Sequence, residues 1–169
     1  MTKKLLLLLI TMGLAFTITA KAQQHATVDG ILADLYGSIT FDENHAPNFD
    51  LFQSLFIDGA RLISVKDTTT YELSIQDYIN SMTKSRESGK IKSFKEHELH
   101  RETEQYGNIM HVFSTYKSNI EAAGRPDSAR GINSIQMLRQ NGEWKIVSLI
   151  WYEENKAHPL PEKYLPESE

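Results

Sequence analysis

The 169-residue sequence contains no cysteine. It can therefore form no disulfide, thiol nucleophile, cysteine-ligated metal site or cysteine-linked lipid anchor. Tryptophan is scarce, with two residues, and basic residues form no long run. Because acidic residues outnumber basic ones and the net charge is −4, the composition argues against a nucleic acid or an anionic membrane as partner.

Only one long apolar run occurs, from Leu5 to Ala20, behind a basic start at Lys3 and Lys4. Ala20-Lys21-Ala22 supplies a small-x-small cleavage pattern, so residues 1–22 are predicted to be a signal peptide. The alternative is a membrane anchor, for which the run is short. We expect a periplasmic or secreted protein, cleaved after Ala22 and free of the membrane afterwards. Loss of three lysines and no acidic residue would change its net charge to −7.

The remaining chain has the length of one domain with a sizeable core. We assign this domain to residues 23–156. Residues 157–169 hold three of the five prolines and are predicted to form an irregular tail.

Three helices are predicted in the first half of the chain. Val28–Thr40 has an apolar stripe at helical spacing, and Asn48 can cap a short helix rich in phenylalanine. A third helix is expected to begin at Ser74, with Asp77 completing the cap, and to end at Gly89. A short strand, residues 60–65, precedes this third helix.

Four strands are predicted to follow, beginning with residues 91–104, and the last two are joined by Asn141-Gly142, a strong hairpin signal. A two-residue turn predicts four cross-strand pairs on one face: Arg139 with Trp144, Met137 with Ile146, Ile135 with Ser148, and Asn133 with Ile150. The same alternation predicts that Trp144 and Trp151 lie on opposite faces. Both faces are apolar, so one should pack on helices and the other on a partner subunit or on the rest of a curled sheet.

This α+β order resembles that of the nuclear transport factor 2-like superfamily, as do FQSLFIDGARL and the segment from GNIMHVFSTY to RGINSIQMLRQNGEWKIVSLIWYEE. The likeness is to its SnoaL-like and uncharacterised bacterial members. The resemblance implies a curved antiparallel sheet wrapped around three N-terminal helices into a cone with a pocket, a cystatin-like α+β roll. It also implies homodimers that pack through the outer sheet face. Family members include isomerases, dehydratases, polyketide cyclases, non-catalytic binders and protein-binding modules.

His111, within the apolar Ile109–Phe113 stretch, is the leading candidate for acid–base chemistry. A two-residue turn at Tyr106-Gly107 would place Glu102 opposite His111, and a longer turn would separate them. The alternative is a strand histidine satisfied by a neighbour or lying at a dimer interface.

Four further residues are candidates for ligand binding. Tyr36 lies on the stripe of the first helix, where its hydroxyl either enters the pocket or reaches solvent beside a core ring. Asn133 and Ser148 would sit among apolar neighbours and need hydrogen-bond partners. Trp151 or Trp144 would line the pocket.

The glutamates of residues 96–104 alternate with other side chains, which predicts a solvated strand face, although Glu98 or Arg101 could reach the cone mouth. His97 and His100 fall on opposite faces of a strand and cannot share one ion. We therefore predict neither a metal nor a cofactor.

Ketosteroid isomerase-like proteins carry an aspartate base in the first strand, where FIDGARLIS places Ser64. A serine hydroxyl alone is no base at pH 7, which argues against isomerase chemistry. The sequence therefore predicts a non-catalytic binder of a small apolar or amphipathic molecule. The alternatives are an acid–base enzyme that uses His111 with Glu102, or Tyr36, and a dimeric protein-interaction module.

Overall fold

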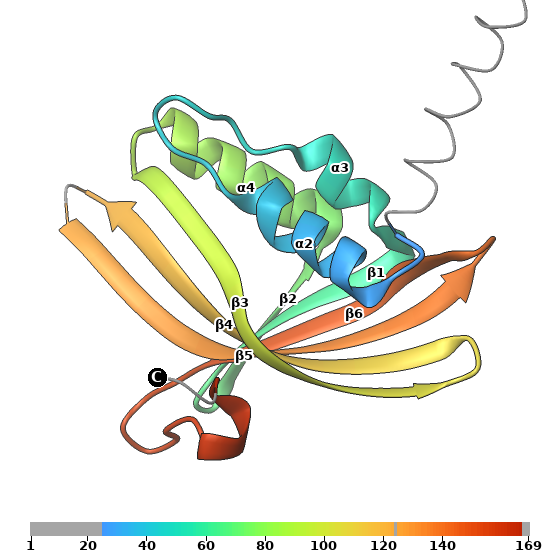
Figure 1. The fold of residues 1–169 in the computed structure, drawn as a ribbon. Coiled ribbons are helices and arrows are strands. Elements are labelled where there is room, and N and C mark those ends of the chain that lie inside the picture. Colours follow the sequence, from blue (N-terminus) through green and yellow to red (C-terminus); the bar gives the residue numbers. More distant parts are fainter. Residues whose placement is uncertain (1–24, 124, 167–169) are drawn as a thin grey trace, which may run out of the picture.

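Residues 25–123 and 125–166 are described in the computed structural model of this chain, and the predicted signal peptide lies outside them. A strongly bent six-stranded sheet holds three helices on its concave side, and the C-terminal segment lies on the opposite side (Figure 1). None of the helices in the described part is long and apolar enough to cross a membrane.

The helices follow their sequence signals closely. α2 (Val28–Ile39) begins at Thr27, whose Oγ1 accepts a hydrogen bond from the Gly30 N–H. α3 (Phe49–Ser54) is capped by Asn48. α4 (Ile75–Glu87) is capped by Ser74 as predicted, and Gly89 follows it at φ +68°.

The strands run in the order β2-β1-β6-β5-β4-β3. Their bounds are β1 (Phe56–Lys66), β2 (Thr69–Ser74), β3 (Ile91–Tyr106), β4 (Ile109–Ala122), β5 (Arg125–Gln140) and β6 (Glu143–Glu153). The predicted sheet was antiparallel throughout, but β1 and β6 pair in parallel, so the sheet is mixed. β2, which pairs antiparallel with β1 directly before α4, was missed by the sequence analysis.

The β5–β6 hairpin turns at Asn141 and Gly142, both at positive φ, and its first pairs match the prediction. A bulge then shifts the register, so Ile135 pairs with Leu149 rather than Ser148, and Asn133 pairs with Trp151 rather than Ile150. Since one extra residue reverses the alternation of faces, Trp151 joins Trp144 on the concave side, contrary to the prediction.

The core fills the space between α2 and the concave face of the sheet. It is formed by apolar side chains of α2 and of the strands β1, β4, β5 and β6 (Ile31, Leu32, Leu35, Leu62, Val112, Ile135, Met137, Trp144 and Ile146 among them). Packing thins out toward α4, none of whose residues is fully buried. This loosely filled side is where a pocket forms.

The C-terminal segment covers part of the convex face. A 3-10 helix, η1 (Glu162–Tyr164), brings the Tyr164 ring to 5.0 Å from that of Phe113, between centroids. The Tyr164 carbonyl accepts a hydrogen bond from the hydroxyl of Thr115, which is fully buried. The predicted irregular tail therefore supplies a cover for the outer apolar face that the sequence analysis did not consider.

Candidate functional site

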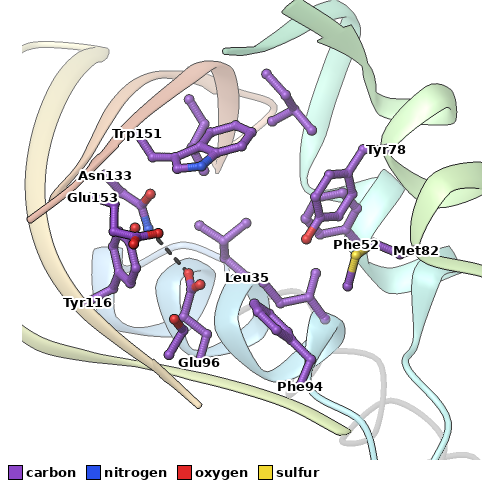
Figure 2. A pocket seen from close by; sticks show the side chains of 14 residues that line it. Leu35, Phe52, Tyr78, Met82, Phe94, Glu96, Tyr116, Asn133, Trp151 and Glu153 are labelled. Carbon is purple, nitrogen blue, oxygen red and sulfur yellow. Dashed lines mark hydrogen bonds between the residues drawn. The ribbon is translucent and has the colours of Figure 1, made fainter. Parts of the chain in front are cut away.

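A concave pocket of about 240 Å³ lies between α4 and the sheet. Its lining comes from all three helices and from five strands (Leu35, Ile39, Phe52, Leu62, Tyr78, Met82, Phe94, Glu96, Tyr116, Ser118, Asn133, Leu149, Trp151 and Glu153). Figure 2 shows the carboxylate of Glu96 near Asn133, Tyr116 and Glu153 at one end, and Phe52, Tyr78 and Met82 at the other. The pocket therefore has a polar end and an apolar end.

The apolar end is built around the short helix α3. The Phe52 ring packs on Phe56 and on Tyr78, at centroid distances of 4.9 and 5.2 Å. These contacts link α3, β1 and α4, so the aromatic wall is held by three separate elements.

The polar end is organised by Glu96 on β3 and Asn133 on β5, with β4 between them. The Asn133 Nδ2 donates to Oε1 of Glu96 at 3.4 Å and to the Tyr36 hydroxyl at 3.2 Å. Both amide hydrogens of Asn133 are thereby engaged, which leaves its oxygen as an acceptor.

Glu96 is the residue of this pocket whose carboxyl pKa is raised. Burial among apolar and aromatic side chains raises the pKa of its carboxyl from 4.5 to about 7, against the opposing hydrogen bond from Asn133. Glu96 thus exchanges a proton near neutral pH, a property that suits an acid, a base or an ion-pairing group.

A second hydrogen-bond network, between α2, β4 and β3, lies behind the pocket. The Ser114 hydroxyl donates to Oε1 of Glu98 at 2.6 Å, so the Tyr36 hydroxyl donates to Ser114 at 2.7 Å. Burial raises the pKa of Tyr36 above its ordinary value and also raises that of Glu98. Arg101 pairs with Glu98 and with Asp29 of α2, which closes the chain of contacts near the surface.

Two predicted ligand-binding residues, Asn133 and Trp151, line the pocket together. Tyr36 is absent from the lining of this pocket, and its hydroxyl does not reach solvent, because it is buried between Ser114 and Asn133. Ser148 falls outside the lining, since the β6 bulge turns it to the convex side. The predicted position of Ser148 opposite Ile135 was therefore wrong by one residue of register.

His111 faces away from the pocket, in a shallow groove on the convex side that also contains Glu102 and Tyr164. The β3–β4 turn is Gly107-Asn108, so His111 pairs with Glu104, and Glu102 pairs with Phe113. The His111 Nε2 lies 3.0 Å from the Ser134 hydroxyl. The predicted His111–Glu102 pair is thus wrong by two residues of register, and neither residue reaches the concave pocket.

The sequence analysis missed Glu96 because it assigned the whole 96–104 stretch to a solvated face. A bulge at Leu99 divides this strand: Glu96 and Glu98 point into the concave side, whereas Glu102 lies on the convex one. The available signal was that Phe94 lies two residues before Glu96 and so on the same strand face. An aromatic residue rarely lies on a fully solvated face.

Ser64 is buried on the concave face beside Trp151, in the register of the parallel β1–β6 pair, and does not line the pocket. The pocket's carboxylate comes instead from β3. Among the described residues, no group of three or more histidine, aspartate or glutamate side chains could hold a metal ion.

No protein-family model matches this sequence, and no curated protein is significantly similar to it in sequence. Solved structures do match it. The hexachlorocyclohexane dehydrochlorinase LinA-type3 from Novosphingobium barchaimii superposes with a TM-score of 0.59 at 12% identity, over 88% of this chain and 99% of its own. A protein assigned as a scytalone dehydratase from Novosphingobium aromaticivorans gives 0.59 at 10% identity, over 92% and 98%.

A protein from Nostoc punctiforme described as having a cystatin-like fold gives a TM-score of 0.54 at 8% identity, over 76% of this chain and 90% of its own. At such identities the likeness concerns the fold alone. It covers almost the whole length of each of these proteins.

Proposed function

Since this chain has the nuclear transport factor 2-like fold, we propose that it binds a small, largely apolar molecule in the concave pocket without catalysing a reaction. The observation that carries the proposal is a cavity of about 240 Å³ with aromatic walls and polar groups gathered at one end. Pockets for small molecules combine these features. A filled cone, by contrast, would have favoured a protein-interaction module.

The test is native mass spectrometry of the purified mature protein, wild type beside Met82→Trp. Met82 lines the apolar end, so an indole at this position should fill the pocket. We expect a retained small molecule on the wild type and none on the variant. Tyr106→Trp, at the exposed end of β3, should behave as the wild type. Equal retention by wild type and Met82→Trp would place binding elsewhere.

Export is part of this proposal. The basic start, the apolar run and Ala20-Lys21-Ala22 support it, and processing there would yield a mature protein that begins at Gln23. N-terminal sequencing of protein recovered from the cell envelope or medium tests it. An intact Met1 on that protein would favour a membrane anchor instead.

A second candidate function is acid–base catalysis, which Glu96 favours because its carboxyl has a pKa of about 7 inside the pocket. Isomerisation of a small enone is a suitable assay. A catalytic Glu96 should make Glu96→Gln slower by roughly 10²–10⁴-fold. The binding proposal expects no turnover above background from either protein.

A further inference from the structure

The polar end of the concave pocket is acidic and carries no opposing charge. Its lining contains two carboxylates, Glu96 and Glu153, and, among the described residues, no lysine, arginine or histidine. The one cation joined to the neighbouring network, Arg101, is already paired with Glu98 and Asp29. An anionic ligand would therefore meet only like charge there.

Two hydrogen-bonding groups at this end, the amide of Asn133 and the carboxylate of Glu96, present acceptors to the pocket. Both amide hydrogens of Asn133 are used by Tyr36 and Glu96, so the amide presents its oxygen. Within the described residues, Glu96 receives no hydrogen bond besides the long one from Asn133, so its carboxylate can still accept. A ligand that donates hydrogen bonds or carries positive charge is the complement of these groups.

Two aromatic rings line the same pocket. Figure 2 shows Tyr116 near Glu96, and Trp151 across the pocket from it. The faces of such rings attract cations, and a desolvated pocket strengthens this attraction. Phe52, Tyr78 and Met82 would then enclose the uncharged remainder of the ligand.

We infer that the ligand of the concave pocket is an organic cation, an apolar body that bears an ammonium group, with Glu96 as its counter-ion and Trp151 and Tyr116 beside the charge. The inference rests on the proposed binding function and names its ligand class. It also gives the pocket a pH response, because an ammonium group pairs with the ionised form of Glu96, whose pKa is about 7.

The groups around Glu96 allow this response to be assigned. Its charge acts on three tyrosines, Tyr36 of α2, Tyr78 of α4 and Tyr116 of β4. Two further carboxylates lie nearby, Glu98 on β3 and Glu153 on β6. Burial raises the pKa of each of the three tyrosines above 10, so none of them ionises below pH 8. A change of affinity centred near pH 7 that Glu96→Gln abolishes would therefore report Glu96 rather than Glu98.

The experiment compares two molecules of the same shape, phenyltrimethylammonium and tert-butylbenzene, with benzenesulfonate as the anion. Binding is followed by tryptophan signals and calorimetry at pH 5.5 and pH 8. We expect the cation to bind at least 10-fold more tightly than the neutral probe at pH 8, with the advantage largely lost at pH 5.5. Benzenesulfonate should not bind.

Glu96→Gln should bind both probes equally at either pH, whereas Glu104→Gln, on the convex face of the same strand, should behave as the wild type. The wild-type pH profile alone decides the matter if Glu96→Gln fails to fold. Equal wild-type affinity for cation and neutral probe, or tighter binding of the anion, would overturn the inference and leave small-molecule binding intact. If none of the three probes binds, both the inference and the binding proposal are overturned.

Discussion

The side-chain amide of Asn133 donates to the carboxylate of Glu96 across the width of β4, which separates their strands. The contact is possible because the sheet bends, which brings the concave sides of β5 and β3 toward each other (Figure 1). Through Asn133, the Glu96 carboxyl in the pocket is linked to the hydrogen-bond network of Tyr36, Ser114 and Glu98. The chemistry of the pocket therefore depends on the curvature of the sheet.

Glu96 should make folding stability depend on pH. Its pKa is 4.5 in the reference state and about 7 in the fold, so the folded state binds the proton more tightly. The resulting stabilisation is complete below pH 4.5 and is lost as pH rises through 7, a loss of about 3 kcal/mol.

Urea unfolding of the wild type and Glu96→Gln at pH 5 and pH 8 measures this loss. The variant should gain stability relative to the wild type as pH rises, and the exposed Glu104→Gln should not. A stability difference between Glu96→Gln and wild type that is the same at both pH values would show that the carboxyl is not buried as described.

Gly131 should be intolerant of a side chain. A Cβ there would lie 2.6 Å from the Tyr116 hydroxyl oxygen and 2.4 Å from the Tyr152 carbonyl oxygen. We expect Gly131→Ala to lower the free energy of unfolding by roughly 1–3 kcal/mol and to push Tyr116 into the pocket. Gly37→Ala is the matched control: its Cβ meets open space within α2, so stability should rise by up to about 1 kcal/mol. Equal effects of the two substitutions would contradict the close packing at Gly131.

Trp144 is a core residue, 3% exposed, on the same face as Met137 and Ile146. Trp144→Ala should therefore cost on the order of 3–5 kcal/mol of folding free energy. Chemical denaturation measures the cost, and a change within about 0.5 kcal/mol would mean that the residue is exposed.

We propose a homodimer that forms through the outer sheet face, and the C-terminal segment covers part of that face. Deleting residues 160–169 would uncover Phe113 and Thr115 on that face. We predict a larger dimer fraction for the deletion than for the full-length mature chain, measured by sedimentation at equal concentration. If the shortened protein remains wholly monomeric, the result would argue against the outer face as an interface.

Local signals were sufficient to predict the helices and the last hairpin. Thr27, Asn48 and Ser74 cap helices as small polar residues do, and Asn141-Gly142 makes the expected turn. The predicted fold is confirmed by the solved structures. β2 was missed because its six residues are mostly exposed and pair only with β1, so they show no alternation of buried and exposed positions.

The site was predicted less well, because the face on which a strand side chain lies depends on the number of residues between it and the turn. One extra residue in β6 brought Trp151 into the pocket and removed Ser148 from it. One extra residue at Leu99 separated the environments of Glu96 and Glu102. Bulges leave no clear mark in a single sequence, so alternation could identify pocket residues only up to the first bulge.

The two tryptophans allow the central claim, uptake of a small molecule by the concave pocket, to be tested in one measurement. Trp151 lines the pocket and Trp144 is enclosed in the core, so the protein has one indole N–H signal for each environment. In a ¹⁵N NMR titration with phenyltrimethylammonium and with tert-butylbenzene, the Trp151 signal should shift to saturation with at least one probe, while the Trp144 signal stays in place. A Trp151 signal that does not move with either probe, or moves only together with that of Trp144, would contradict the account.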